Sequence, residues 1–265
     1  MTMTIQSACL KPNYGVKANI ARFFSSGSKS SASQAIVELR EYFLFPEHAS
    51  SFMDEASASS DLRKKMSPLR FFTQPETGGQ LHVATHSYYY EGGLSQRDQV
   101  RKSMAENSEW KAFVSSTRKY VQSQKSTIFV EAPLVRELNL PGLGNILDPQ
   151  PGSDSIIELR RYNLQLGYDT VPKFLKLYGA GLPSKLNAEG TDPTTTLLTL
   201  LYSEVGRLNE VIEVWRHGNG VTAMEQSRVA ARQAKEWRSS IASIADLAIE
   251  FTATIHKPLP FSPIK

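Results

Sequence analysis

The sequence predicts an α+β protein built from two tandem copies of one βαββαβ unit. The first observation is a repeated strand: IVELREY at residues 36–42 returns as IIELRRY at residues 156–162, with Glu, Arg and Tyr at the same alternate positions. The second is a repeated helix, in which Glu109-Trp110-Lys111 answers Glu236-Trp237-Arg238. The third is that strand-like and helix-like segments follow one another in the same order in both halves.

Each copy opens with a strand and a helix. Residues 36–45 alternate as a strand does, and Pro46 stands where the first turn of a helix accepts proline. In the second copy, Asp169 and Thr170 give a helix start signal, and apolar residues at helical spacing come after them. These apolar residues are Val171, Phe174, Leu175, Tyr178 and Leu182.

A hairpin comes next in each copy. In the first copy its strands are predicted at residues 69–73 and 81–90, on either side of the turn-rich QPETGG. In the second copy they are predicted at residues 195–205 and 210–217, around Gly206.

A second helix and a last strand complete each copy. Ser95-x-x-Asp98 and Thr222-x-x-Glu225 match the capping-box pattern, in which a hydroxyl satisfies an orphan amide and an acid reaches back. We therefore expect a helix to begin at each of these motifs. The last strands are predicted at residues 126–131 and 248–255.

The pattern divides the chain into four parts. Residues 1–35 form a targeting segment, residues 36–132 the first ferredoxin-like domain, and residues 155–265 the second. Residues 133–154 are rich in proline and glycine, which is typical of a linker.

The two faces of each predicted sheet differ in character. Val37 and Leu39, and their counterparts Ile157 and Leu159, are expected to face the helices. The opposite face carries charged and aromatic side chains, which would form an exposed patch unless something covered them. We therefore expect the two domains to pack sheet to sheet as an intrachain dimeric α/β barrel, with this face lining its lumen.

The predicted lumen is the strongest candidate for a ligand pocket. Buried charges need partners, so Glu38 is expected to pair with Arg40, and Glu158 with Arg160. Pairing of the two sheets is the favoured interpretation of this set, and ligand binding is the alternative. The candidate residues are Glu38, Arg40, Tyr42, His86, Tyr88, Glu158, Arg160, Tyr162, Glu213, Trp215 and His217.

The N-terminal segment has the composition of a mitochondrial transit peptide. It is rich in Ser and Ala and has no acidic residue. Its four basic residues are Lys11, Lys17, Arg22 and Lys29. A disordered tail and a plastid address are the alternatives. The only cysteine, Cys9, lies in this segment, so the remaining chain offers no thiolate or disulfide. We expect a mitochondrial protein, in the matrix.

Charge and hydropathy argue against two classes of partner. Outside the N-terminal segment the acidic and basic residues balance, so no basic footprint for nucleic acid is expected. No stretch approaches the roughly 18 apolar residues of a membrane-spanning helix. Protein partners are expected, and homo-oligomerisation is left open.

Several segments of the sequence together resemble the NIPSNAP family of mitochondrial proteins. The resemblance is carried by IVELREY, IIELRRY, GRLNEVIEVWRH at residues 206–217, the helix ending EW(K/R) and the C-terminal KPLPFSPIK, and it covers residues 36–265. It implies tandem dimeric α/β-barrel halves, mitochondrial residence and a non-enzymatic scaffold role in quality control through binding of autophagy receptors. The chain departs from the family's His-x-Trp pair, because Glu213 precedes Trp215.

Two functions follow as hypotheses. The first is the non-enzymatic binding or scaffold role. The alternative is a small-molecule-binding or haem-binding barrel, or a cofactor-independent monooxygenase that uses the lumen. No catalytic residue or cofactor is predicted. No metal site is predicted either, since His82 and His86 on one strand would lie about 13 Å apart and could not share one ion.

Overall fold

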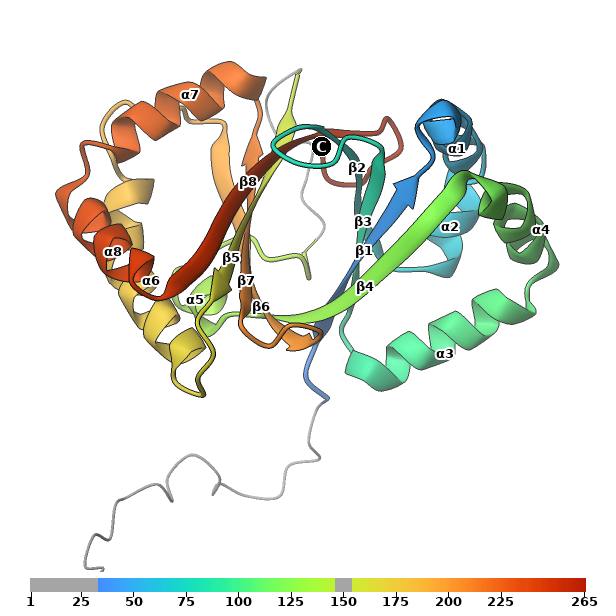
Figure 1. Cartoon of the computed structure of the whole chain (residues 1–265), viewed down its shortest axis with the longest axis horizontal. Coiled ribbons are helices and arrows are strands. Elements are labelled where there is room, and N and C mark those ends of the chain that lie inside the picture. The colour runs from blue at the N-terminus through green and yellow to red at the C-terminus, as the bar shows by residue number, and fades with distance from the viewer. Residues whose placement is uncertain (1–32, 146–153) are drawn as a thin grey trace, which may run out of the picture. The chain divides into compact units, whose positions relative to one another are not determined.

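Eight antiparallel strands close into one barrel in the order β1-β3-β2-β8-β5-β7-β6-β4 (Figure 1). The computed structural model describes residues 33–145 and 154–265. Residues 1–32 of the predicted transit peptide and residues 146–153 of the predicted linker lie outside the described residues.

Each half supplies four strands and its own helices. The elements of the first half are β1 (Ile36–Leu44), a short 3-10 turn (Pro46–His48), α1 (Ala49–Ala58), α2 (Ser60–Met66), β2 (Leu69–Thr77), β3 (Val83–Tyr90), α3 (Gly93–Glu106), α4 (Ser108–Thr117), a second 3-10 turn (Arg118–Tyr120) and β4 (Val121–Glu131). The helix α5 (Pro133–Glu137) lies in the predicted linker. The elements of the second half are β5 (Ile156–Leu164), α6 (Thr170–Leu186), β6 (Thr195–Val205), β7 (Glu210–His217), α7 (Gly220–Ala231), α8 (Lys235–Ala245) and β8 (Ala248–Pro258).

The barrel closes through two seams between the halves. Strands β2 and β8 form one seam, where Gln74 pairs with Lys257, and β4 and β6 form the other, where Phe129 pairs with Ser203. Because every strand has two neighbours, no sheet edge within the barrel is left unpaired. The predicted fold of two ferredoxin-like units joined in one barrel is confirmed.

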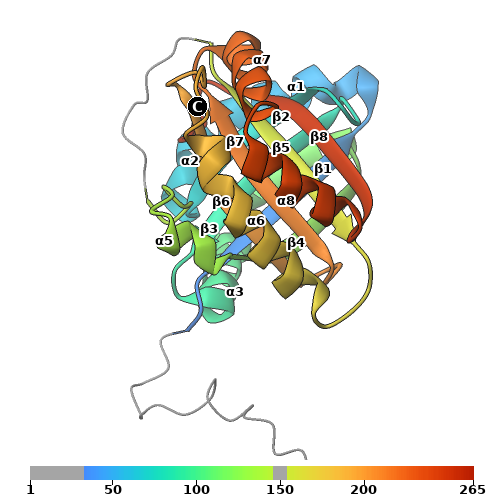
Figure 2. The same cartoon turned by 90° about the vertical axis from the view of Figure 1, so that its left-hand side faces the viewer.

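Helices cover the barrel on two sides. Figure 1 shows α1 to α4 beside the first half's strands and α6 to α8 beside those of the second half. In the second half α6 packs against α8, and Figure 2 shows both lying over the strands, roughly along β7 and β8. Among the described residues, no helix is both long and apolar enough to cross a bilayer.

The predicted capping boxes are wrong, because α3 and α7 begin two residues before them. The first residues are Gly93 and Gly220, both with φ of +67°. A Cβ atom at Gly93 would lie 2.6 Å from the carbonyl oxygen of Gln34, and one at Gly220 would lie 2.8 Å from that of Asp154. A tight turn that needs glycine therefore starts each helix, in the same way in both halves.

The predicted assignment of sheet faces is also wrong. The barrel interior is filled by apolar side chains from both halves, among them Val37, Leu39, Ile157 and Leu159. The alternate positions, which carry Glu38 and Glu158, point outward to the helices. Alternation identifies two faces but not which of them turns inward, and the helices supply the cations that buried carboxylates need.

A polar cluster inside the barrel joins the two halves. Arg161 lies 2.7 Å from Glu41 of the other half and 3.0 Å from Glu210 of its own half. The two carboxylates compensate one largely buried guanidinium, so the cluster fixes the two sheets relative to each other.

We predict that the seam can be cross-linked. With Cys9 replaced by Ser, the double variant Gln74→Cys/Lys257→Cys should form an intrachain disulfide, because these residues are direct partners in the β2–β8 ladder. Gln74→Cys/Glu250→Cys is the control, since Glu250 lies seven residues farther along β8, roughly 23 Å away. Non-reducing electrophoresis and mass spectrometry report the bond, and equal cross-linking of both variants contradicts the register.

Candidate functional site

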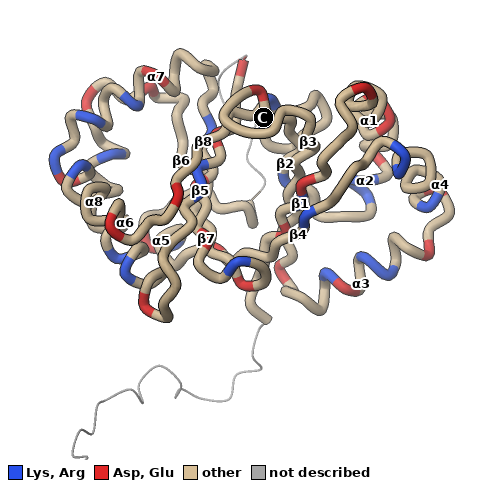
Figure 3. Tube along the Cα trace, in the orientation of Figure 1, with Lys and Arg blue, Asp and Glu red and all other residues tan. Residues whose placement is uncertain are grey.

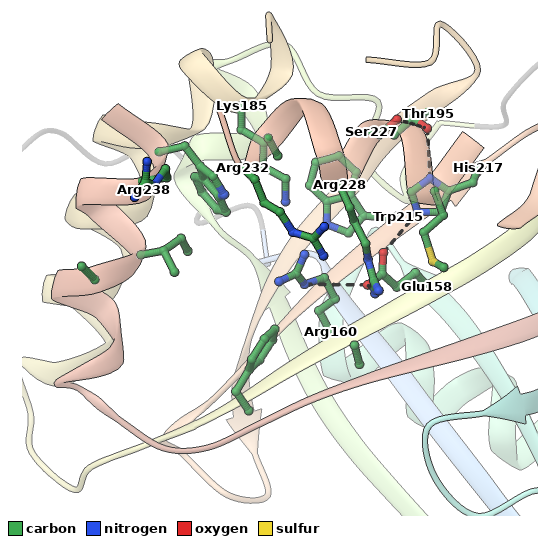
Figure 4. Close-up of a pocket in the computed structure, with 17 residues that line it drawn as sticks. Glu158, Arg160, Lys185, Thr195, Trp215, His217, Ser227, Arg228, Arg232 and Arg238 are labelled. Atoms are coloured by element: carbon green, nitrogen blue, oxygen red, sulfur yellow. Dashed lines mark hydrogen bonds and ion pairs between the residues drawn. The ribbon is translucent and has the colours of Figure 1, made fainter. Parts of the chain in front are cut away.

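A pocket of about 590 Å³ lies between the outer face of the second half's sheet and helices α6, α7 and α8. Its walls combine basic, aromatic and apolar side chains. Figure 4 shows the lining, which includes Glu158, Arg160, Lys185, Thr195, Trp215, His217, Met224, Ser227, Arg228, Arg232, Trp237, Arg238, Ile241 and Phe251.

Glu158 on β5 is the buried carboxylate of this pocket. Arg228 of α7 donates a hydrogen bond to it at 2.6 Å, His217 of β7 donates another at 3.1 Å, and Arg160 lies at 3.9 Å. Burial raises the pKa of Glu158, but the hydrogen bond from His217 and the charges of Arg160 and Arg228 together lower it to about 2. Glu158 is therefore ionised at neutral pH and holds α7 against the sheet.

His217 has both ring nitrogens engaged. Its Nε2 lies 3.1 Å from Glu158, and its Nδ1 lies 3.0 Å from the hydroxyl of Thr195. Since an ionised carboxylate only accepts hydrogen bonds, Nε2 is the donor in the first contact. An axial haem ligand needs a free ring nitrogen facing the ligand. His217 does not offer one, so it is not placed to serve as an axial haem ligand.

A second buried carboxylate, Glu213 on β7, lies under the pocket wall. Arg160 and Lys185 each approach it to 3.7 Å, Tyr162 donates a hydrogen bond at 2.6 Å, and the indole of Trp215 donates another. Burial raises its pKa, but the charges of Arg160 and Lys185 and the two hydrogen bonds lower it overall. Glu213 therefore stays ionised despite its burial.

Lys185, near the end of α6, is held by aromatic rings. Its ammonium lies 3.9 Å from the ring centre of Trp215 and 4.4 Å from that of Trp237. Among the described residues it has no hydrogen-bond partner, and Glu213 is its nearest ion-pair partner at 3.7 Å. Burial lowers the pKa of Lys185 to about 7, even though Glu213 acts against this shift. The side chain can thus change between its charged and neutral forms near neutral pH.

The rim of the pocket adds positive charge. Arg232 and Arg238 are exposed, and within the part of the chain that the structure describes neither has an ion-pair partner. Figure 4 shows Arg160, Arg228 and Arg232 pointing toward the same part of the pocket. Counted together, the buried and exposed parts of the pocket contain five cationic side chains and two carboxylates. The pocket therefore carries excess positive charge.

The predicted candidate residues form two separate groups instead of one shared lumen. In the second half, Glu158, Arg160, Trp215 and His217 line the pocket, and Tyr162 and Glu213 support it from below. In the first half, the outward-facing residues meet α1 to α4 on the opposite side of the barrel: Glu38, Arg40, Tyr42, His86 and Tyr88. The predicted lumen is wrong because these side chains point away from the barrel interior.

Both predicted ion pairs are present, but they are long. Glu38 lies 4.0 Å from Arg40, and Glu158 lies 3.9 Å from Arg160. The shorter contacts come from the helices, since Arg97 of α3 lies 2.9 Å from Glu38.

The sequence prediction missed every pocket residue that the helices contribute, among them Lys185, Arg228 and Trp237. A signal existed for each of these three. Lys185 follows Tyr178 and Leu182 on the buried face of α6, where a charged residue is unusual. Arg228 and Trp237 stand at the repeat positions of Arg101 and Trp110.

Comparison with known proteins identifies the family of one half. The NIPSNAP family model matches residues 37–135. No curated protein sequence matches the chain significantly.

Solved structures share the fold. A proposed monooxygenase from Fusobacterium nucleatum superposes with a TM-score of 0.59 at 10% identity, over 86% of this chain and 93% of that one. One from Lactobacillus acidophilus gives 0.55 at 9% identity, over 85% and 94%. An anthrone oxidase-like protein gives 0.54 at 12% identity, over 86% and 92%. At these identities the similarity concerns the fold alone.

We predict opposite stability effects at Glu213 and Lys185. Glu213→Gln should lower the free energy of unfolding by about 3–5 kcal/mol at pH 7, because Arg160 and Lys185 lose their shared carboxylate. Lys185→Met should leave it unchanged or raise it, since Glu213 keeps Arg160 and two hydrogen bonds. Urea unfolding followed by circular dichroism measures both.

The acid dependence checks the same assignment. The pKa of Glu213 is lowered on folding, so its contribution is complete above its ordinary value of 4.5 and is lost as the pH falls below it. The Gln variant should therefore lose less stability than the parent between pH 5 and pH 3. Equal losses for Glu213→Gln and Lys185→Met at pH 7 would contradict the assignment.

Proposed function

We propose that the second half binds a small organic anion in the pocket between its sheet and α6 to α8. The chain belongs to the NIPSNAP family through its residues 37–135. The observation that carries this proposal is the excess of cationic side chains around a cavity that also contains two tryptophans. No other feature of the described residues combines charge, enclosure and apolar surface in this way except the related pocket of the first half.

The charges support an anion and not a cation. Glu158 and Glu213 are each already paired with more than one cation, so neither is available to attract a positively charged ligand. Arg232 at the rim has no acidic partner among the described residues and is free to meet a carboxylate. Glu158 and Glu213 already offset part of the positive charge, so we propose a ligand with a single negative charge.

The size and apolar lining support a flat organic body. The pocket volume of about 590 Å³ lies within the roughly 300–1,000 Å³ of small-molecule sites. Trp215 and Trp237 offer ring faces, and Met224, Ile241 and Phe251 add apolar surface. An aromatic carboxylate has both parts that such a pocket recognises.

Binding without chemistry agrees best with the side chains present. His217 is held by Glu158 and Thr195, so it is not poised to take a proton from a ligand. The monooxygenase alternative stays a prediction. Oxygen uptake with a quinone or polyphenol and the purified chain would support it in place of simple binding.

The mitochondrial scaffold role remains part of the proposal. It is supported by the basic, acid-free N-terminal segment and by the family resemblance, which implies autophagy receptors as partners. A scaffold that also binds a small anion could report the level of that anion to its protein partner.

We predict that 2-naphthoate binds in the second half and quenches tryptophan fluorescence. In a Trp110→Phe background the signal comes only from Trp215 and Trp237. Arg232→Gln should weaken binding about fivefold, the effect of one rim charge worth about 1 kcal/mol. Arg207→Gln is the control, because it removes the same charge from an exposed site outside the pocket. Equal effects of the two variants would indicate a nonspecific charge effect.

The same titration should depend on pH. Affinity should fall as the pH rises from 6 to 8, since the pKa of Lys185 is about 7 and the neutral amine no longer attracts the anion. Glu213, whose pKa is lowered, and Arg160, whose pKa is raised, both keep their charges in this range. Lys185→Met should give a flat profile, and a profile that keeps its slope would rule out Lys185 as the titrating group.

We predict that residues 1–35 direct a fused fluorescent protein into mitochondria. Replacing Lys11, Lys17, Arg22 and Lys29 by Gln in the same fusion should abolish import, because matrix targeting segments need positive charge. Microscopy and protease protection of isolated organelles measure the location. A parent fusion that stays in the cytosol would refute the mitochondrial assignment.

A further inference from the structure

A second cavity, of about 550 Å³, lies on the other side of the barrel, against the outer face of the first half's sheet and α2 to α4. It is separate from the pocket of the proposed function. Its lining includes Arg40, Tyr42, Arg63, Arg101, Met104, Trp110, Lys111, Phe113, Val114, Arg118 and Gln124.

The two pockets are built from equivalent positions. Arg101 of α3 approaches Glu38 to 3.9 Å, as Arg228 of α7 approaches Glu158 to 2.6 Å. Figure 3 shows basic residues along α3 and near the end of α7. In the ladders, His86 pairs with Arg40 as Glu213 pairs with Arg160. The first half therefore has the frame of the second half's pocket, with different residues at two central places.

The first difference removes a negative charge. Where the second half has the carboxylate of Glu213, the first half has His86, which is fully buried and lies against Phe72, Tyr42 and Tyr88. Burial and the nearby charges of Arg63 and Arg40 hold the pKa of His86 well below its ordinary value, so the ring is neutral. Glu38 is the carboxylate that Arg40 and Arg101 approach, at 4.0 Å and 3.9 Å, and its 2.9 Å contact is with Arg97.

The second difference makes a positive charge permanent. Arg63 of α2 takes the place of Lys185 and lies 5.0 Å from the ring centre of Trp110, as Lys185 lies over Trp237. Its side chain is 2% exposed, its Nη1 donates to the hydroxyl of Tyr88 at 2.7 Å, and its Nε has no partner among the described residues. A guanidinium does not lose its proton in a protein, so this charge persists at every physiological pH.

The balance of charge then differs between the halves. The lining of the first-half pocket contains five cationic side chains, and among the described residues that line it none is acidic: the cations are Arg40, Arg63, Arg101, Lys111 and Arg118. The second-half pocket has as many cations but includes Glu158 and rests on Glu213. Trp110, Phe113 and Tyr42 supply aromatic surface in the first half.

We propose that the first half holds a second, independent ligand site, which takes an organic anion with two or more negative charges and an aromatic body. A dicarboxylate or an aryl phosphate has this chemistry, and a monoanion would leave most of the positive charge in the pocket unpaired. The chain would thus bind two classes of anion, a monoanion in the second half and a polyanion in the first.

The test uses 2,6-naphthalenedicarboxylate and the full chain. In Trp215→Phe/Trp237→Phe, Trp110 is the only tryptophan and reports on the first-half pocket. We expect saturable quenching that Arg101→Gln weakens about tenfold, while Arg207→Gln leaves it unchanged. Arg101 is suited to this test because Glu38 keeps Arg97 and Arg40 when it is removed. 1-Naphthyl phosphate distinguishes a preference for phosphate from one for two carboxylates.

Calorimetry on the unsubstituted chain gives an independent measurement should the double variant fail to fold. Binding of the dianion that survives Arg232→Gln and weakens in Arg101→Gln supports the proposal. Absence of heat and of quenching up to millimolar concentrations overturns it, as does equal weakening by Arg101→Gln and Arg207→Gln. Weakening by Arg232→Gln alone also overturns it, since the dianion would then occupy the second half.

Discussion

The ion pair between the first strand of each half and the helix that follows its hairpin, α3 or α7, constrains the rest of the structure. Glu38 on β1 meets Arg97 of α3 at 2.9 Å, and Glu158 on β5 meets Arg228 of α7 at 2.6 Å. A carboxylate on the outer face of a sheet can be covered by a helix only if the helix brings a cation to it, because an unpaired buried charge is strongly destabilising. In each half the ion pair therefore determines which helix covers the sheet. The positively charged pocket lies beside this pair.

The two halves compensate their buried charges in different ways. In the second half a lysine and a carboxylate lie at the centre, and Glu213 makes the burial of Lys185 tolerable. In the first half no carboxylate among the described residues pairs with Arg63, but its guanidinium lies over the rings of Trp110, Phe72 and Phe113 and donates to Tyr88. Planar, delocalised charge is suited to such stacking, and a compact ammonium is less so. The two differences between the halves therefore belong together: where Glu is replaced by His, the buried Lys is replaced by an Arg that the aromatic rings can hold without a carboxylate.

The sequence was sufficient to predict the fold because the duplicated unit shows the same order of strand and helix patterns twice. The strand pair IVELREY and IIELRRY identified the equivalent elements, and the second hairpin lies where the apolar pattern predicted it, at Thr195–Val205 and Glu210–His217. The direction of the faces could not be predicted, since both faces of β1 and β5 are buried and a period of two is the same in either direction. The pocket was half predicted: its predicted strand residues come from two short segments, on β5 and β7, that the sequence analysis had singled out, whereas Lys185 and Trp237 come from helices that only folding brings together.

The division between a shared barrel and separate helix layers explains where the halves were free to differ. Val37 and Leu39 pack in one cluster with Ile157 and Leu159, so a change inside the barrel disturbs both halves at once. The Arg161 ion pairs with Glu41 and Glu210 add the same constraint to the polar end of the barrel. On the outer faces, α1 to α4 contact one sheet and α6 to α8 the other, so a substitution there affects a single pocket. Divergence of ligand chemistry is therefore expected on the outer faces of the barrel, where the neutral ring of His86 and the ionised carboxylate of Glu213 stand at equivalent positions.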